Sequence, residues 1–589
     1  MISLETREII KAALGKIKAD IILRGGKIVN VYTREIIEND VVITSNKIIH
    51  VGEETEVFEG EHTSVKNIEG HFVCPGLIDS HIHIESSMLT ITEFSKAIIP
   101  HGTTTVVIDP HELTNITGIP GLEILIDEAT KSPITYLIEA PSCVPSLPGF
   151  ETSGAEINDA DIGELMQRKD IFALAEMMNY PGVIMRDSEV LAKIDYAKKA
   201  GKLIEGHAPL LSGKELQAYI ASGISSDHET TTAEEALEKL RLGMKIQIRE
   251  GSFAKDLERV LSKLKDLTID TRNLLISTDD RNPVDLQEKG HLDYTYRLMM
   301  KLGINPLEAI QMLTINPATH LGLQDKIGGI SPGKNADIIV VNNLEDFEVS
   351  LTIAKGNILY EKGVLQYKSD KMFYPQFILD TVRNLEIPTT QYLQVKSEIE
   401  GKVKVRVIRL KEHSLITESL EAFLDVKDSF LEPDIENDIL PVVILNRHTS
   451  ENNIGKGFMT GLGLKNAALA STIAHDCHQL ICVGTDYDLM VKAISKIKES
   501  KGGQVLVTPN NIVLLPLEFA GIMTTLSLEE TVEKHKILQS SLKDVETKLS
   551  DPFMALAFIA LPVIPHLKIT DLGLVDVDTL KIVDLIIKE

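Results

Sequence analysis

Cysteine is scarce in this chain, and long apolar runs are missing. The 589 residues include only four cysteines, too few for a disulfide scaffold, and so low a content suits a reducing compartment. No apolar stretch approaches the ~20 residues that a membrane-spanning helix needs. The first 18 residues combine charged and apolar side chains at helical spacing, which predicts an amphipathic helix and not a signal peptide. We therefore expect a cytoplasmic protein without a membrane partner.

Positive charge is also in deficit. Sixty Lys and Arg residues stand against 86 Asp and Glu residues, which gives a net charge of -26. Such a charge repels nucleic acid and anionic membranes, so a small-molecule substrate is the natural expectation. The apolar fraction of 43% is ordinary for a globular protein. Because single cores stop growing at roughly 250–300 residues, more than one domain is expected.

Two histidines early in the chain give the first sign of chemistry. The apolar run 72–78 reads as a buried strand, and it leads directly into Asp79-Ser80-His81-Ile82-His83. Alternate side chains of a strand share a face, so His81 and His83 point into the same space. Two imidazoles at a strand end can begin a metal site, but a His-x-His pair alone is weak evidence. The His-x-His pair indicates a metal site only if later strands supply further ligands.

Residues 76–323 supply such ligands. Short apolar runs alternate with amphipathic stretches in this segment, which predicts a (β/α)8 barrel. The active sites of such barrels lie at the C-terminal ends of the strands, and a potential ligand or acid–base group follows the apolar part of most strands here. The expected strands are 77–84, 103–109, 134–139, 171–176, 202–207, 223–228, 245–249 and 274–279.

The segments on both sides of the predicted barrel indicate a split β-sandwich. Short apolar runs punctuated by turn residues fill 19–72, and matching runs follow at 337–341 and 353–360. We expect residues 1–75 to form the N-terminal helix and the first part of this sandwich, and residues 324–372 to form its second part. The fold class expected is therefore α/β, with an additional C-terminal α+β domain in residues 373–589.

The C-terminal region carries features that the barrel does not explain. Residues 453–463 are rich in glycine, and 467–473 reads as a helix. The pattern Gly-x-x-x-x-Gly-Lys-Ser/Thr is not present as such, so a nucleotide-binding loop is not expected. His475, Asp476 and His478 follow. They could hold a further metal ion, reach a barrel mouth in the same or another subunit, or form a polar cluster within their own domain.

Six barrel residues form the candidate metal set. Mixed nitrogen and oxygen donors suit Mn, Fe or Zn better than Cu(I) or Ca. Glu176 is the only acid in an otherwise apolar strand, and a metal partner would explain a carboxylate that is costly to bury unpaired. Taken singly, each histidine is more readily a satisfied core or surface residue, and Asp279-Asp280 could simply cap a turn. Their coincidence at strand ends favours the metal interpretation. The six are His81, His83, Glu176, His207, His228 and Asp279.

At this point the chain resembles a known family. The segment from Pro75 to His83, the split sheet and the order of the ligands resemble the amidohydrolase superfamily. Further motifs, spread over essentially the whole chain, are similar to those of the bacterial and archaeal adenine deaminases. They include His83-Ile84-Glu85-Ser86-Ser87, Asp109-Pro110-His111-Glu112, Ala175-Glu176-Met177-Met178-Asn179, Gly206-His207-Ala208-Pro209 and Pro516-Leu517-Glu518-Phe519-Ala520-Gly521.

The resemblance implies a reaction and a cofactor. The reaction is hydrolytic deamination of adenine to hypoxanthine and ammonia by metal-bound hydroxide, as in purine salvage and adenine catabolism. Two divalent ions are implied, Mn2+ or Fe2+ with Zn2+ possible. One would be held by His81, His83, Glu176 and Asp279, and the other by His207 and His228 with Glu176 as the bridge. Many superfamily members bridge with a carbamylated lysine, which the fourth strand lacks. A homodimer or larger homo-oligomer is expected.

Roles for single residues follow as hypotheses. Asp279 takes the hydroxide proton and delivers it to the leaving amine, and Glu85 or Glu112 protonates a ring nitrogen. The resemblance also implies substrate contacts from Ser86, Asp109, His111 and Ser142.

Three alternative interpretations of the sequence exist. An amidohydrolase acting on another heterocycle or a cyclic amide would use the same fold. A non-catalytic scaffold would be expected to lose ligands, whereas all six candidates are present. A cytidine-deaminase type of site needs a Cys-x-x-Cys pair, and the chain contains none.

Overall fold

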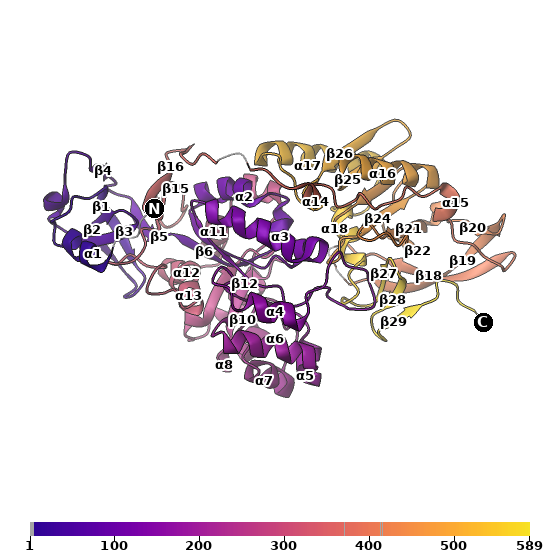
Figure 1. The fold of residues 1–589 in the computed structure, drawn as a ribbon, viewed down its shortest axis with the longest axis horizontal. Helices are drawn as coiled ribbons and strands as arrows, with labels where there is room; N and C mark the ends of the chain where they lie inside the picture. The colour runs from indigo at the N-terminus through magenta and orange to yellow at the C-terminus, as the bar shows by residue number, and fades with distance from the viewer. Residues whose placement is uncertain (1–4, 370–371, 413, 415, 589) are drawn as a thin grey trace.

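The computed structural model describes residues 5–369, 372–412, 414 and 416–588. Figure 1 shows an elongated molecule with an N-terminal sheet at one end, a central part of strands and helices, and the C-terminal part at the other end. The described N-terminal helix α1 (Thr6–Ala13) is shorter than the predicted one. Residues 1–4 of that prediction lie outside the described residues.

Strands from both sides of the central part form one sheet of nine strands. Its order is β17-β16-β15-β14-β5-β1-β2-β3, with β4 paired to β1. The two segments meet where β5 pairs antiparallel with β14, Cys74 opposite Ile339. The strands are β1 Ile21–Asn30, β2 Glu35–Thr44, β3 Lys47–Gly52, β4 Ser64–Asn67, β5 Phe72–Pro75, β14 Ile338–Val341, β15 Val349–Ala354, β16 Asn357–Glu361 and β17 Val364–Leu365, with the short helix η1 Thr55–Phe58. One buried cluster contains Leu23 and Val73 together with Ile338 and Leu351, so the two segments share a core.

Each of the eight strands predicted for the central part is present. They are β6 Leu77–Ile82, β7 Thr103–Ile108, β8 Thr135–Ile138, β9 Ala173–Met177, β10 Leu203–Gly206, β11 Ser226–Asp227, β12 Lys245–Arg249 and β13 Leu274–Ser277. They pair in parallel within three sheets, β6-β7-β8, β9-β10 and β11-β12-β13. Most of these strands end one or two residues earlier than predicted, because the polar residues at the predicted ends are not part of the strand pairing.

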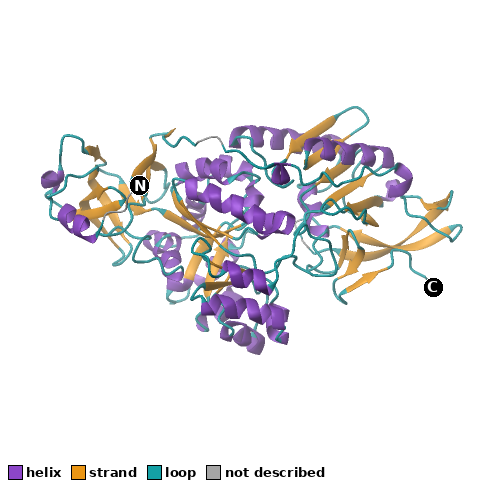
Figure 2. Cartoon of the chain, in the orientation of Figure 1, coloured by secondary structure: helices purple, strands orange, loops and turns teal. Residues whose placement is uncertain are grey.

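Helices connect these strands. The first seven strands are each followed by at least one helix, and four helices follow the eighth; in Figure 2 the central strands lie among helices. Within the described part of the chain, no helix combines the length and the apolar character that crossing a membrane requires. The helices are η2 Ile84–Ser87, α2 Ile91–Ile98, η3 Ile99–His101, α3 His111–Lys131, α4 Asp159–Leu165, α5 Tyr180–Met185, α6 Ser188–Lys199, α7 Gly213–Ala221, α8 Ala233–Arg241, α9 Leu257–Leu264, η4 Thr271–Asn273, α10 Pro283–Glu288, α11 Leu292–Lys301, α12 Pro306–Leu313 and α13 Ile315–His320.

The C-terminal part is built on a second nine-stranded sheet. Its order is β20-β19-β18-β22-β21-β24-β23-β25-β26, and β27-β28-β29 form a smaller sheet. The strands are β18 Lys402–Arg409, β19 Glu418–Lys427, β20 Phe430–Leu431, β21 Leu440–Leu445, β22 Ile454–Thr460, β23 Ala468–Ser471, β24 Leu480–Gly484, β25 Gly503–Val507, β26 Ile512–Pro516, β27 Leu567–Thr570, β28 Gly573–Asp576 and β29 Lys581–Val583. The helices are α14 Gln376–Leu379, α15 Thr390–Leu393, η5 Ile435–Asn437, α16 Tyr487–Ser500, α17 Leu528–Leu542, η6 Lys543–Val545 and α18 Pro552–Ile559.

One prediction for this part is wrong. Residues 467–473 were expected to form a helix, but they contain strand β23. Its alanines favour a helix locally, yet the strand is buried along its whole length between β24 and β25, and this packing overrides the local preference. The glycine-rich stretch before it is largely strand β22, not a phosphate-binding loop.

Candidate metal centre

All six predicted ligands lie within two residues of the C-terminal end of a strand, and they converge. His81 is the second-to-last residue of β6, and His83 directly follows that strand. Glu176 lies inside β9. His207 and His228 directly follow β10 and β11, and Asp279 follows β13 by two residues. Five of the six side chains are nearly inaccessible, and His207 is partly exposed. Because parallel strands end at one edge, residues far apart in the sequence meet at one point.

His83 shows how the backbone prepares a ligand. Its Nδ1 donates to the carbonyl oxygen of Asp109 at 3.1 Å. The proton therefore lies on Nδ1, and the lone pair on Nε2 faces the centre of the site. That Nε2 lies 3.2 Å from His81 Nε2 and 3.4 Å from Asp279 Oδ1. Electron-rich atoms this close together need either a proton or a metal ion between them, and a neutral His83 offers its Nε2 to a metal ion.

Glu176 lies between two groups of nitrogen atoms. Its Oε1 is 3.3 Å from His83 Nε2. Its Oε2 is 3.1 Å from His228 Nε2 and hydrogen-bonded to His207 Nδ1. Burial by itself raises the pKa of this carboxyl group, but the neighbouring His207 and His228 hold it well below its usual value. One carboxylate with a separate partner group on each oxygen has the arrangement of a bridging ligand.

Asp279 has a charged partner at the end of the neighbouring strand. Arg249, the last residue of β12, places Nη1 3.3 Å from Asp279 Oδ2. Arg249 also pairs with Glu229 and with Asp256. The other Asp279 oxygen, Oδ1, faces His81 at 3.6 Å. The arginine therefore fixes the orientation of the carboxylate while one oxygen remains directed at the histidines.

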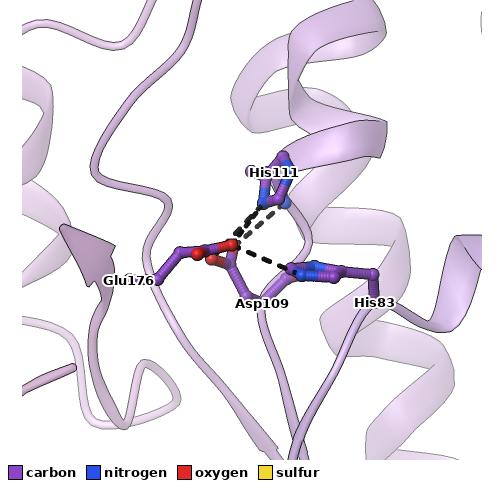
Figure 3. A group of neighbouring side chains, drawn as sticks. All are labelled: His83, Asp109, His111 and Glu176. Carbon is purple, nitrogen blue, oxygen red and sulfur yellow. Dashed lines mark hydrogen bonds and ion pairs between the residues drawn. The ribbon is translucent and has the colours of Figure 1, made fainter. Parts of the chain in front are cut away.

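Two residues predicted to contact substrate lie in the same cluster. Figure 3 shows Asp109, which follows β7, and His111, which begins α3, beside His83 and Glu176. His111 Nδ1 is 3.4 Å from Asp109 Oδ2 and 3.5 Å from Glu176 Oε1. Several buried atoms around the site have no hydrogen-bond partner among the described residues: Glu85 Oε2, Asp109 Oδ2, His111 Nδ1 and both carboxyl oxygens of Glu139. Buried polar atoms are normally paired, so these indicate a place for a ligand.

The other two predicted substrate residues have partners within the protein. The Ser86 hydroxyl donates to Asp280. The Ser142 hydroxyl donates to the carbonyl oxygen of Glu176 at 2.5 Å. Both hydroxyls therefore support the site by holding neighbouring groups, and their contact with a substrate stays a prediction.

Glu85 and Glu112 differ sharply in their surroundings. Glu85 accepts one backbone hydrogen bond, from Leu113 at 3.0 Å, and burial raises its pKa to about 7. Both oxygens of Glu112 are engaged, one with His475 Nδ1 at 2.6 Å and the other with His478 Nε2. Burial alone raises the pKa of Glu112, but the two histidines hold it well below its usual value.

These contacts answer the question left open for the C-terminal histidines. His475 and His478 reach Glu112, in the first turn of α3, within the same chain. The C-terminal part therefore touches the central part beside His111. Asp476, between the two histidines, lies near His111 and Glu112.

The donor set fits divalent metal ions. The clustered ligand atoms are imidazole nitrogens and carboxylate oxygens, which Mn, Fe and Zn accept in proteins. The spacing of 3.1–3.6 Å between these nitrogen and oxygen atoms resembles the edge of a coordination shell with bonds of about 2.1 Å. The residues present therefore suit a divalent metal site.

Comparison with known proteins is consistent with this site. The amidohydrolase family model matches residues 72–359, and the model of the adenine deaminase C-terminal domain matches residues 414–581. The adenine deaminase of Methanococcoides burtonii is 40% identical over 583 residues, 98% of each chain. That of Archaeoglobus fulgidus is 40% identical over 580 residues, again 98% of each chain. That of Clostridium botulinum is 37% identical over 574 residues, 97% of this chain and 96% of its own.

Among solved structures, a β-aspartyl dipeptidase from Fervidobacterium islandicum matches 60% of this chain and 99% of its own, with a TM-score of 0.45 and 19% identity. The relatives match this chain almost from end to end, and both family models fall on the corresponding parts of the mixed α/β fold. The chain belongs to the adenine deaminase family of the amidohydrolases.

Proposed function

We propose that this protein hydrolyses adenine to hypoxanthine and ammonia at a site for two divalent metal ions. Relatives that are 40% identical over 98% of the chain are named adenine deaminases. The observation that carries the proposal is the position of Glu176, which has His83 on one oxygen and His207 and His228 on the other. A buried carboxylate in this position suits a bridge between two ions.

The proposed ligand assignment is the one that the family resemblance implies, and the contacts of Glu176 support it. One ion would take His81, His83, Glu176 and Asp279, and the second would take Glu176, His207 and His228. Both ions are proposed to be Mn2+ or Fe2+, and Zn2+ is a further candidate, because the donor atoms are nitrogen and oxygen. When bound, such ions supply an activated water molecule and stabilise developing negative charge.

Asp279 is placed to move a proton. Its Oδ1 faces the ligand cluster, while its Oδ2 is held by Arg249 at 3.3 Å. A carboxylate fixed in this way can accept a proton from the attacking water and pass it to the departing amine. Arg249 prevents the carboxylate from rotating away between the two transfers.

Glu85 is the better candidate for protonating a ring nitrogen. Its Oε2 is buried and has no hydrogen-bond partner among the described residues, so it can reach a ligand. Both oxygens of Glu112 are occupied by histidines, and a proton held there would compete with those bonds. We therefore assign the ring protonation to Glu85 and a holding role to Glu112.

The three parallel sheets are proposed to be parts of one closed (β/α)8 barrel. Backbone hydrogen bonds support this where the sheets adjoin, from Ala140 to Ala173 at 2.9 Å and from Ser225 to Ile204 at 3.1 Å. Between the last and first strands, the backbone N–H of Asp279 donates to the carbonyl oxygen of His81 at 3.1 Å. The backbone N–H of His83 donates to the carbonyl oxygen of Asp279 at 3.0 Å. The domain division at residues 75, 323 and 372 and a homo-oligomeric assembly remain part of the proposal.

Substrate profiling tests the proposed reaction. The protein is expressed with added Mn2+ and assayed for ammonia and for the ultraviolet change from adenine to hypoxanthine. Purines, pyrimidines and cyclic amides are compared at equal concentration. Fastest turnover of adenine is expected. A protein that carries stoichiometric metal but prefers another heterocycle or a cyclic amide would contradict adenine as the substrate.

A further inference from the structure

Asp476 is a buried carboxylate that lacks a hydrogen-bond donor. Its side chain belongs to the C-terminal part and is 5% exposed, and its oxygens are not among the fully enclosed unpaired atoms of the described residues, so a small ligand can still reach them. The nearest cation is His475, 3.9 Å away. One carboxylate oxygen lies within 4.8 Å of ligand-type atoms of both His111 and Glu112. The carboxylate group of Asp476 therefore lies beside His111, at the margin of the candidate metal centre.

The loop that carries Asp476, residues 472–479 between β23 and β24, is held firmly. The fully buried guanidinium of Arg447 donates to the carbonyl oxygen of His478 at 2.5 Å and to that of Ala520 at 3.1 Å. His448 Nε2 donates to the carbonyl oxygen of Cys477 at 2.6 Å. Such fixed backbone contacts set the position of Asp476 before any ligand arrives.

The contact with Glu112 holds the loop against the central part. The backbone N–H of Ala474 donates to His478 Nδ1 at 3.2 Å, so the proton of that neutral ring lies on Nε2 and is donated to Glu112. His475 Nδ1 donates to the second Glu112 oxygen at 2.6 Å and its ring stacks on Phe558. Because His478 Nε2 carries a proton, it has no lone pair for a metal. The three residues form a hydrogen-bonded contact and not a third metal site.

We propose that Asp476 accepts a hydrogen bond from an imidazole-ring N–H of the substrate, so that the C-terminal part selects an unsubstituted purine base. This rests on the proposed function. A ligand N–H would supply a donor to this largely buried carboxylate, for which no donor is seen among the described residues. Adenine has two kinds of N–H group, the amine that must face the reacting centre and the ring N–H. The ring N–H is left for an acceptor on another side of the pocket.

The consequence is discrimination against purines alkylated at N9. Such a base has no imidazole N–H at either N7 or N9, as in a nucleoside. A site built to accept that hydrogen bond rejects a ligand that lacks it, because the carboxylate is then buried without a partner. The selectivity for a free base would thus come from residues outside the strand ends that bind metal.

The test compares adenine with 9-methyladenine as substrates for the metal-loaded enzyme. Asp476→Ala should lower kcat/KM for adenine by about 10- to 100-fold, mainly through KM, the range expected for a lost hydrogen bond to a charged group. The unmodified enzyme should turn over 9-methyladenine slowly, and Asp476→Ala should not slow this substrate further, so the preference for adenine shrinks. Asp476→Asn, which keeps the shape, should give a smaller loss in the same direction and covers the case in which the alanine variant fails to fold.

The matched control is Asp571→Asn. Asp571 is also a buried acid that joins the C-terminal part to the central part, by accepting from the Thr152 N–H at 3.0 Å, but it is not in the clusters at the metal centre. The Asp571→Asn variant should leave the preference for adenine over 9-methyladenine unchanged. Equal losses for both substrates, the same change in Asp571→Asn, or loss of bound metal from the Asp476 variants would overturn the proposal. A wild-type enzyme without turnover of adenine would instead reject the proposed function itself.

Discussion

His83 directs its Nε2 at Glu176 Oε1, 3.3 Å away, because its Nδ1 donates to the carbonyl oxygen of Asp109. The backbone at the end of β7 thus sets the tautomer of a histidine at the end of β6. This is the outer-sphere support that metal-binding histidines need. The same relationship makes the role of Glu176 testable.

Glu176→Gln should remove both metal binding and turnover. An amide has one oxygen and one N–H2 group, so it cannot present an acceptor to both groups of histidines. We expect activity to fall by more than about 1000-fold, equivalent to ~4 kcal/mol of transition-state stabilisation, and metal content measured by mass spectrometry to fall with it. Glu164→Gln, at an exposed position on α4, is the control and should change neither. Full metal content in Glu176→Gln would argue against a bridging carboxylate.

Arg249→Met should slow turnover without removing metal. The variant frees Asp279 Oδ2 from its partner at 3.3 Å but leaves all six ligands intact. Loss of a charge-assisted hydrogen bond predicts a decrease in kcat of about 10- to 100-fold. Arg259→Met is a matched control, because Arg259 pairs with Asp256, a partner it shares with Arg249, but has a side chain that is 62% exposed. If both variants behave alike, Arg249 does not act through Asp279.

Glu85→Gln should lower kcat and leave metal content unchanged. Glutamine keeps the acceptor for the Leu113 N–H but cannot transfer a proton. General acid catalysis typically contributes about 100- to 10,000-fold, so a loss in that range is expected. Glu112→Gln should instead weaken the contact with His475 and His478, which a thermal unfolding measurement would detect. Unchanged turnover in Glu85→Gln would remove this residue from the mechanism.

Glu151 is expected to make the stability of the fold depend on pH. It is buried in the loop after β8, and burial, followed by the nearby charge of Asp476, raises its pKa to about 8. Between the ordinary glutamate pKa and about 8 the folded state holds more protons than the unfolded state, so stability falls as pH rises, by up to about 1.4 kcal/mol per pH unit. Glu151→Gln should flatten this slope in unfolding measurements from pH 5 to 8. The same slope in both proteins would show that Glu151 is not responsible.

The ligand set could be predicted because its signal is local. A short apolar run followed by a histidine or an acid places that group at a strand end, and parallel strands bring such ends together. The strands that carry His81, Glu176, His207 and Asp279 were all found near the predicted positions. The exact ends of these strands were not predicted, because a strand ends where its hydrogen bonds end and not where the apolar run ends.

The contact between Glu112 and His475 could not be predicted in this way. The two residues are 363 positions apart, and no periodicity links them. Arg249 was seen at a strand end, but only the packing shows that it holds Asp279. In β23 the local alanine content pointed to a helix, and burial between two strands decided otherwise.

A metal titration tests the central claim most directly. The protein is stripped with a chelator, Mn2+ is added back in known ratios, and bound metal and adenine deamination are measured on the same samples. The account predicts that activity appears with the metal and reaches its plateau at about two ions per chain, in keeping with a bridging carboxylate. Full adenine deamination by the stripped protein, or a plateau at one ion per chain, would contradict it.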